Sequence, residues 1–207
     1  MHLEALSDAT RALWEKCRFL KDDFYLAGGT ALALQLGHRR SVDLDFFSSQ
    51  SIKKTSLKTI EETFKTPVSV SVRTSDELTV EISGVKMTLL HYPFPLILNT
   101  LPTDIVSLAT VRDIAAMKAY ALGRRGSLKD YVDLYAIFSR NIISLEIVIA
   151  DANKKYDALF NDRLFCEQLL YTDDIEPEAI NWIVAQVSLD DMKKYFREIV
   201  SAQKKHI

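Results

Sequence analysis

Two aspartates spaced two residues apart, Asp43 and Asp45, have the types and spacing needed for metal chemistry. They lie in the stretch SVDLDFF, which alternates like a strand, so both side chains should leave the same face of the sheet. Adjacent carboxylates repel each other unless a cation neutralises them, and hard oxygen ligands of this kind suit Mg²⁺. A solvated strand face is the alternative interpretation. The apolar neighbours Leu44, Phe46 and Phe47 favour the metal, because idle carboxylates in an apolar strand are costly.

A turn of small residues, Gly28-Gly29-Thr30, lies between an apolar strand-like segment and an apolar helical one. Its bare backbone can approach a phosphate, and the N-terminus of the following helix favours an anion. The alternative is a tight turn in which Thr30 caps the helix. Twelve residues (31–42) separate Thr30 from Asp43, enough for one helix and a return to the neighbouring strand, so turn and carboxylates can face each other across a cleft. Arg39 and Ser41 lie between them and can supply a guanidinium and a hydroxyl to a nucleotide. The alternative for Arg39 is an ordinary surface arginine.

A second group of charged residues falls in the C-terminal half. Lys118 lies in the alanine-rich stretch DIAAMKAYALG, where its charge should seek a partner such as a triphosphate. Arg125 follows seven residues later and shares a helix face with Lys118 if the helix continues; a solvated basic face is the alternative. Asp130 and Asp133 share a face at i, i+3 spacing. Asp130 can act as a general base or a ligand, while Asp133 can equally pair with Lys129 or cap local structure.

The elements that must position these residues change character near Asp104. Before it, strands are expected in the segments FYLA, SVDLDFF, PVSVSVRTS, ELTVEI and VKMTLLHY, the last two joined by a two-residue loop. Helices are expected at 4–20, 30–37, 57–64, 111–123, 128–140, 144–160, 162–171, 176–187 and 189–204. The sequence therefore predicts an α/β (α+β) protein with a mixed sheet flanked by helices. Its α/β core would span 1–103, and a helical region over 104–207 would pack on that core.

Composition excludes several classes of protein. Hydrophobic residues make up 48% and charged residues 26% of the 207-residue chain, and the net charge is −2, so no global charge indicates nucleic-acid binding. An RNA partner would need a local basic surface, for which the candidates are Arg39, Arg40, Arg124, Arg125 and Lys129. The sequence has no apolar run of membrane-spanning length and no secretory signal at its start, so we expect a cytoplasmic protein without a membrane partner.

The segment LAGGTALALQLGHRRSVDLDFF resembles the AbiEii/AbiGii toxin family of the nucleotidyltransferase superfamily. The family's G-G-T-x-L and R-x-S-x-D-L-D-F signatures fall on Gly28, Gly29, Thr30, Leu32, Arg39, Ser41, Asp43, Leu44, Asp45 and Phe46. The later segment DIAAMKAYALGRRGSLKDYVDLY is similar to the family's lysine helix and R-G-x-x-K-D-x-x-D-L segment. Its functional positions fall on Lys118, Arg125, Lys129, Asp130 and Asp133.

This resemblance implies a nucleotidyltransferase-like fold that binds a nucleoside triphosphate and Mg²⁺. It further implies transfer of a nucleotide to an RNA, tRNA or protein acceptor, in a toxin with a cognate antitoxin. Asp43, Asp45, Lys118 and Asp130 would then be catalytic, and the first two would hold the metal. The nucleotide would be bound by Gly28, Gly29, Thr30, Arg39, Ser41 and Arg125.

The sequence departs from the superfamily pattern at one position. A third carboxylate usually faces the aspartate pair from a later strand, but VKMTLL at 85–90 contains no acid and has Thr88 where one is expected. Glu81, on the preceding strand, is a weak substitute, so the third role would pass to Asp130. Two other hypotheses remain. The chain can be a catalytically degenerate nucleotide- or partner-binding protein of the same fold, or a metal-dependent glycosyltransferase, which also uses a D-x-D motif.

Overall fold

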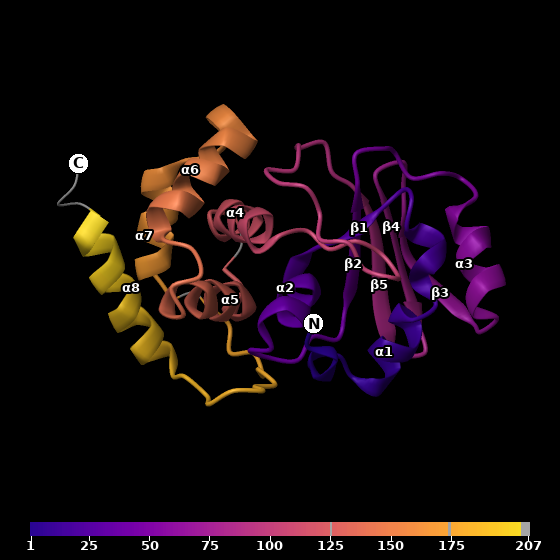
Figure 1. Ribbon diagram of the computed structural model, residues 1–207, viewed down its shortest axis with the longest axis horizontal. Coiled ribbons are helices and arrows are strands. Elements are labelled where there is room, and N and C mark those ends of the chain that lie inside the picture. The colour runs from indigo at the N-terminus through magenta and orange to yellow at the C-terminus, as the bar shows by residue number, and fades with distance from the viewer. Residues whose placement is uncertain (125, 174, 204–207) are drawn as a thin grey trace.

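The computed structural model describes residues 1–124, 126–173 and 175–203, and a five-stranded mixed sheet forms its N-terminal half. The strand order is β1-β2-β5-β4-β3, in which β2 and β5 run parallel and the other neighbouring pairs run antiparallel (Figure 1). The strands are β1 Tyr25–Leu26, β2 Leu44–Ser48, β3 Val68–Arg73, β4 Glu77–Ile82 and β5 Val85–His91. This arrangement confirms the predicted mixed sheet.

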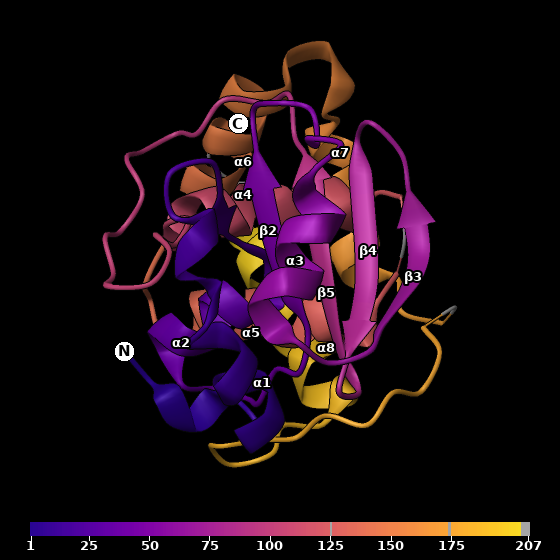
Figure 2. The same ribbon diagram turned by 90° about the vertical axis from the view of Figure 1, so that its right-hand side faces the viewer.

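Helices cover both faces of the sheet and make up the C-terminal half. Two of them, α1 and α3, lie on one face, which Figure 2 views directly, and α2, α4 and α5 lie on the other side. The helices are α1 Asp8–Trp14, α2 Gly28–Leu36, α3 Ser56–Phe64, α4 Val111–Leu122, α5 Leu128–Ser139, α6 Leu145–Tyr156, α7 Asp162–Leu170 and α8 Leu189–Gln203. Short 3-10 helices are η1 Leu3–Ala5, η2 Cys17–Leu20 and η3 Asp157–Leu159. No helix in the described ranges is both long and apolar enough to cross a membrane.

The alternation along β2 decides which side chains reach the site. Leu44 and Phe46 are fully buried, and Phe46 stacks on Trp14 of α1 with 6.2 Å between ring centroids. The intervening Asp45 and Phe47 point to the opposite face, because successive strand residues alternate. Truncating a buried aromatic such as Phe46 to alanine typically costs about 3–5 kcal/mol. The apolar half of the motif thus secures the strand that presents the acidic half.

The helical half continues the same hydrophobic core. α4 packs against α2, α5 and α6, and the core cluster runs without a break from Leu6 to Val200. The sheet ends with β5 and the helical bundle begins with α4, so the change of character predicted near Asp104 falls in the connection between them. The Thr110 hydroxyl accepts a hydrogen bond from the Asp113 amide and caps α4 at its start. The division into separate regions at 103/104 stays a prediction.

Three local predictions are wrong. Residues 4–20 do not form one helix, because α1 is flanked by separate 3-10 turns. Asp43 precedes β2 instead of lying in it. Residues 176–187 are not helical: the amide of Arg40 donates to the Asn181 carbonyl at 2.7 Å, and the amide of Ile183 donates to the His38 carbonyl at 3.2 Å. Their backbone groups are satisfied across the chain instead of within a helix. We call the segment 175–187 the strap.

Candidate functional site

A cleft of about 700 Å³ lies between the sheet and the helices α4 and α5. Its floor comes from the face of β2 and β5 that points away from α1 and α3, and its other wall comes from α4 and the start of α5. Eight of the ten residues predicted from the sequence line it: Gly28, Gly29, Arg39, Ser41, Asp43, Asp45, Lys118 and Asp130. Of the other two, Thr30 is buried beside the cleft, and Arg125 lies outside the described residues.

The first glycine of the turn brings the backbone against the second aspartate. Gly28 has φ +64°, a backbone conformation that residues with a side chain rarely adopt. A β-carbon there would stand 3.2 Å from Oδ2 of Asp45. The amide of Ala27 also donates to the Asp45 carbonyl at 3.0 Å. Because α2 begins at Gly28, its N-terminal amides and the Asp45 carboxylate lie at the same end of the cleft.

The side chain of Thr30 in the turn holds the backbone of the first aspartate, Asp43. Thr30 is 1% exposed, and its hydroxyl contacts the hydroxyl of Ser41 at 2.7 Å. The same hydroxyl donates to the carbonyl of Asp43. A buried hydroxyl with both bonds made is a structural element that orients the Asp43 segment. The N-cap of α2 is Ala27, so Thr30 does not cap the helix.

The aspartate pair faces a threonine across the sheet. In the parallel pairing of β2 with β5, Asp45 lies opposite Thr88, which is 8% exposed and lines the cleft. Glu81 is exposed and pairs in register with Lys86. Glu77 does line the cleft, and its Oε1 accepts a hydrogen bond from Thr79 at 2.6 Å. Sequence reasoning missed Glu77, although the register of the hairpin would have put it on the same face as Thr88.

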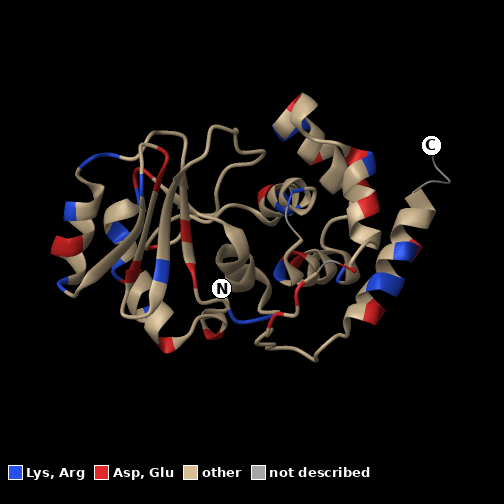
Figure 3. Ribbon diagram, turned by 180° about the vertical axis from the view of Figure 1, so that it is seen from behind, with Lys and Arg blue, Asp and Glu red and all other residues tan. Residues whose placement is uncertain are grey.

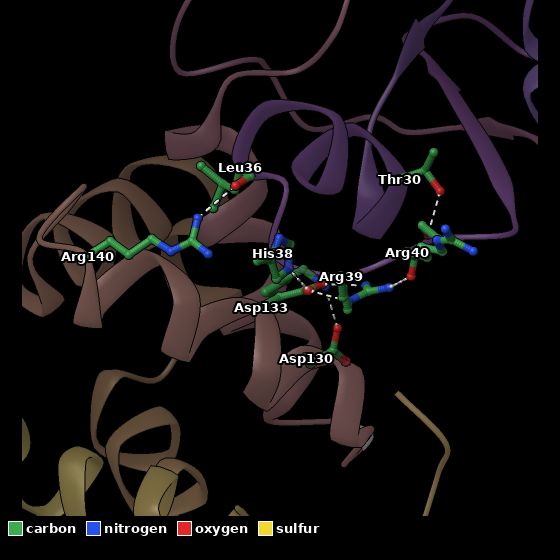
Figure 4. Close-up of polar contacts among 10 residues, drawn as sticks. Thr30, Leu36, His38, Arg39, Arg40, Asp130, Asp133 and Arg140 are labelled. Carbon is green, nitrogen blue, oxygen red and sulfur yellow. Dashed lines mark hydrogen bonds and ion pairs between the residues drawn. The ribbon is translucent and has the colours of Figure 1, made fainter. Parts of the chain in front are cut away.

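A buried cluster of charges backs the glycine turn (Figure 4). The Arg39 guanidinium donates from Nε and Nη2 to the two oxygens of Asp133, at 2.7 and 2.9 Å. Lys118 Nζ lies 2.8 Å from Oδ1 of Asp130 and 2.5 Å from Oδ2 of Asp133. The Nε2 atom of His38 contacts Oδ1 of Asp133 at 2.6 Å. Asp133 therefore connects α5 with both α4 and the loop after α2.

The protonation states of this cluster follow from burial and mutual attraction. Burial alone would raise the pKa of Asp133, but Lys118, Arg39 and the His38 hydrogen bond hold that pKa well below its ordinary value. Burial likewise works against Lys118 and Arg39, yet the neighbouring carboxylates raise the pKa of both. For His38 the effect of burial exceeds the attraction of Asp133, and the pKa of the imidazole is lowered. At neutral pH the cluster thus contains ionised Asp133, two cations and a neutral imidazole.

Several partners in this cluster differ from those that spacing suggested. Asp133 could have paired with Lys129 or capped local structure, whereas Lys129 pairs with Glu178 of the strap at the rim of the cleft. α4 ends at Leu122, so no continuous helix face joins Lys118 to position 125. Neither Glu178 nor the pairing of Asp133 with Arg39 carries a local sequence signal, because the partners are far apart in the chain.

Comparison with known proteins agrees with this geometry. The family model "Nucleotidyl transferase AbiEii toxin, Type IV TA system" matches residues 11–93, which contain the glycine turn and both aspartates. An uncharacterised protein of Aquifex aeolicus is 30% identical over 181 residues, covering 86% of this chain and 83% of that protein. The chain belongs to the AbiEii nucleotidyltransferase toxin family. The predicted resemblance is confirmed.

Solved structures show that the AbiEii chain shares its fold with other nucleotidyltransferase proteins. MenT4, a nucleotidyltransferase toxin from Mycobacterium tuberculosis, is 19% identical, with a TM-score of 0.64 over 92% of this chain and 80% of that one. A protein from H. pylori described provisionally as a nucleotidyltransferase is 17% identical, with a TM-score of 0.57 over 97% and 99% of the two chains. At such identities the likeness concerns the fold.

The residues of this AbiEii chain fit a magnesium ion that is shared with a substrate. The described residues contain no group of three or more His, Cys, Asp or Glu side chains arranged to hold a metal. Mg²⁺ commonly takes only one or two protein carboxylates, with phosphate oxygens and water completing its shell. Asp43 and Asp45, both lining the cleft beside the N-terminus of α2, supply such a pair of hard oxygen ligands.

Proposed function

We propose that this protein is a Mg²⁺-dependent nucleotidyltransferase that moves a nucleotide from a nucleoside triphosphate to an acceptor. We further propose that it acts as a toxin alongside a cognate antitoxin, as its family membership suggests. One observation supports the activity above all: a carboxylate pair, a glycine turn and a buried lysine converge on a single cleft. An anionic donor and the cation that neutralises it would meet complementary groups there.

Asp43 and Asp45 would hold the metal ion, which would neutralise charge that develops on the transferred phosphoryl group. The hydroxyl of Thr30 acts indirectly: it donates a hydrogen bond to the backbone carbonyl of Asp43 and so fixes the position of the Asp43 carboxylate. Gly28 contributes by lacking a side chain, since a β-carbon would crowd the Asp45 carboxylate. These two supports explain why D-x-D is accompanied by a small-residue turn.

The phosphates of the donor would lie between the N-terminus of α2 and Lys118. Backbone amides at a helix N-terminus attract anions. Ser41, whose hydroxyl contacts that of Thr30, also lines the cleft. Lys118 is held at the cleft by two carboxylates, so it is preorganised to offset phosphate charge. We assign Arg39 a positioning role, because its guanidinium is bonded to Asp133 behind the turn.

In the transfer step, an acceptor oxygen would form a bond to the α-phosphorus as the bond from that phosphorus to the bridging oxygen breaks. Pyrophosphate leaves with the electron pair, and the acceptor gives up its proton. Asp130 lines the cleft and accepts a hydrogen bond from Lys118, so it would position or deprotonate the acceptor. Thr88, opposite Asp45, leaves Asp130 as the carboxylate assigned the third role.

RNA, including tRNA, is the acceptor we propose. Acidic and basic residues are interspersed on the outer helices α3 and α8 (Figure 3), so a polyanion would need the basic residues beside the cleft. Arg40 is exposed, and Arg124 and Lys129 line the cleft rim. RNA binding through such contacts should weaken steeply with salt in proportion to the phosphates neutralised. A flat salt dependence would favour a protein or small-molecule acceptor instead.

A catalytically degenerate nucleotide-binding protein is the second candidate, and the hydroxyl of Thr88 in place of a third acid favours it. The experiment that separates the two is incubation of the protein with RNA, cell extract and each labelled triphosphate in Mg²⁺. Mass spectrometry would then identify any labelled product. We expect nucleotide addition that disappears in Asp43→Asn/Asp45→Asn. Tight triphosphate binding without any labelled RNA or protein would support the degenerate protein.

A further inference from the structure

One end of the cleft is aromatic, in contrast to the ionic end formed by the aspartates and Lys118. Phe47, Tyr92 and Tyr120 line this end. Phe47 meets the Tyr92 ring edge-on with 5.2 Å between centroids, and the Tyr92 hydroxyl contacts the hydroxyl of Tyr156 at 2.5 Å. Tyr156 stacks on Tyr120 at 4.0 Å, nearly parallel at 14°. The rings therefore form one connected array from the sheet to α4.

Arg124 lies over the Tyr120 ring at the end of this array. Its Cζ atom lies 3.5 Å from the centroid of the Tyr120 ring, whose other neighbour in the stack is Tyr156. Nη1 donates to the carbonyl of Tyr120 at 2.9 Å, and Nη2 donates to the carbonyl of Leu159 at 3.0 Å. An exposed arginine is ordinarily a flexible side chain, but here a ring and two backbone acceptors fix the plane of the guanidinium. Arg124 remains exposed and lines the cleft.

We propose that the guanidinium of Arg124 is the stacking platform for the base of the nucleoside triphosphate. One face of this plane is covered by Tyr120, so the other face is the one that a planar ligand can stack on. Arginine planes and aromatic rings are common partners of bases, and such stacking accepts any base because every base has a π face. The inference rests on the proposed function, since it concerns the ligand of the same cleft.

Spacing along α4 agrees with this assignment. Arg124 follows Lys118 by six residues, of which the first four lie in α4 and the last two lie beyond its end at Leu122. At a helical rise of 1.5 Å the four residues to Leu122 span about 6 Å along the axis, and the turn adds to that separation. If Lys118 offsets the charge of the phosphates, the sugar would span the interval and the base would reach the aromatic end. Met117 and Ala121, which also line the cleft, supply an apolar wall.

A phosphate contact is the competing role for Arg124. An arginine that binds phosphate does so through the edge of its fork, with paired N–H donors aimed at oxygen atoms. Here one donor of Nη1 and one of Nη2 are already directed at backbone carbonyls, and Cζ lies over the Tyr120 ring, 3.5 Å from its centroid. The orientation thus favours a ligand that stacks over one that chelates.

The test compares affinities for the four nucleoside triphosphates with affinity for inorganic tripolyphosphate, by calorimetry in Mg²⁺. In Arg124→Ala, binding of the nucleotides should weaken about ten-fold, the loss of one base stack, while binding of tripolyphosphate should change less than about two-fold. Arg124→Lys should behave like Arg124→Ala, because it keeps the charge and loses the plane. Tyr120→Leu should also weaken nucleotide binding, whereas Tyr120→Phe should not. The matched control is Arg163→Ala, an exposed arginine on α7 that pairs with Glu167 away from this cleft.

Each contrary result overturns the inference in a recognisable way. If Arg124→Ala weakens tripolyphosphate as much as nucleotides, and Arg124→Lys restores both, the residue is a charge contact. Unchanged nucleotide affinity in Arg124→Ala removes it from the donor site, even where RNA binding is lost. Both of these outcomes leave the proposed function intact, because the wild-type protein still binds the donor. A wild-type protein that binds neither nucleotides nor tripolyphosphate would overturn the proposed function and this inference together.

Discussion

Gly29 lies directly against the guanidinium of Arg39, and a β-carbon at Gly29 would stand 2.3 Å from Nη2. The end of an arginine side chain can ordinarily swing away from such a clash. Arg39 cannot do so without cost, because Nη2 and Nε are both bonded to Asp133 in an almost fully buried pair. Gly29 is thus required by the charged cluster behind it as well as by any phosphate in front of it.

The first prediction follows from this contact. Gly29→Ala should destabilise the fold by about 1–3 kcal/mol, the usual cost of forcing extra atoms into a packed site. Urea unfolding measures the effect. Gly123→Ala is the matched control, because a β-carbon there would meet Leu164 at an ordinary 3.6 Å. Since Gly123 already has helical φ and ψ, the control should be neutral or slightly stabilising. Equal stability of Gly29→Ala and wild type would show that Arg39 moves freely.

The second prediction concerns the aspartate pair. Asp43→Asn/Asp45→Asn should abolish Mg²⁺-dependent triphosphate binding in calorimetry without unfolding the protein. Its melting temperature should be equal or higher, because two adjacent carboxylates no longer repel each other. Glu81→Gln, on the same face of the sheet but exposed opposite Lys86, should bind normally. Unchanged Mg²⁺ and nucleotide affinity in the double variant would contradict the metal assignment.

The third prediction separates two roles of Lys118. Lys118→Ala should destabilise the protein by about 3–5 kcal/mol, because Asp130 and Asp133 would lose a buried cation. Below the melting transition it should also weaken triphosphate binding more than monophosphate binding, since an electrostatic contact scales with ligand charge. Calorimetry with both ligands at one temperature measures the ratio. An equal loss for the two ligands would indicate that the lysine is purely structural.

The fourth prediction tests whether Asp130 acts in the reaction. Asp130→Asn keeps the size of the side chain and an oxygen that can still accept from Lys118. Triphosphate binding should therefore be nearly normal, while transfer to the acceptor should be lost, the signature of an interaction made only in the transition state. Single-turnover assays with a labelled triphosphate give both quantities. Full transfer activity in this variant would exclude Asp130 and make Glu77, which also lines the cleft, the next carboxylate to replace.

The fifth prediction is a loss of stability in acid that begins with His38. Burial lowers the pKa of this histidine in the folded protein, so the unfolded chain takes up a proton first, as the pH falls through about 6.5. The free energy of unfolding should then decrease by up to about 1.4 kcal/mol per pH unit. Asp133, whose folded pKa is well below its ordinary value, adds a further loss below about pH 4. Urea unfolding at pH 8 to 2 checks both windows, and His38→Asn should remove the upper one. A stability that is flat from pH 7.5 to 5.5 would contradict it.

Local spacing predicted the parts of the site that lie close together in sequence. The glycine turn, its helix and the aspartate strand follow from short-range patterns, because backbone direction and side-chain face are fixed within a few residues. The helix predicted over 30–37 does end there, with Leu36 as its last residue and Gly37 in the left-handed conformation after it. The alternation of β2 likewise predicted that Asp45 leaves the face opposite Leu44 and Phe46, although Asp43 lies before the strand. What such patterns cannot supply is the partner from another element.

The strap and Asp133 illustrate that limit. Residues 176–187 have a helix-compatible composition, yet their backbone groups bond to the loop around Arg40, a contact that no local propensity encodes. The sequence left the partner of Asp133 open, and only the position of α5 in the fold shows that this partner is Arg39. Glu77 entered the cleft through the register of the β4–β5 hairpin. The positions of these residues could not be predicted from local sequence, because the contacts that stabilise them come from groups far away in the chain.

The bond between Arg39 and Asp133 spans 94 residues, and the strap then returns to Arg40 from still later in the chain. During synthesis, the glycine turn and both aspartates leave the ribosome long before the groups that hold them in place. A chain interrupted before α5 would carry the complete D-x-D motif with no support behind it. The ability to bind a donor should therefore arise only after α5 and the strap have been synthesised, well after the motif itself has left the ribosome.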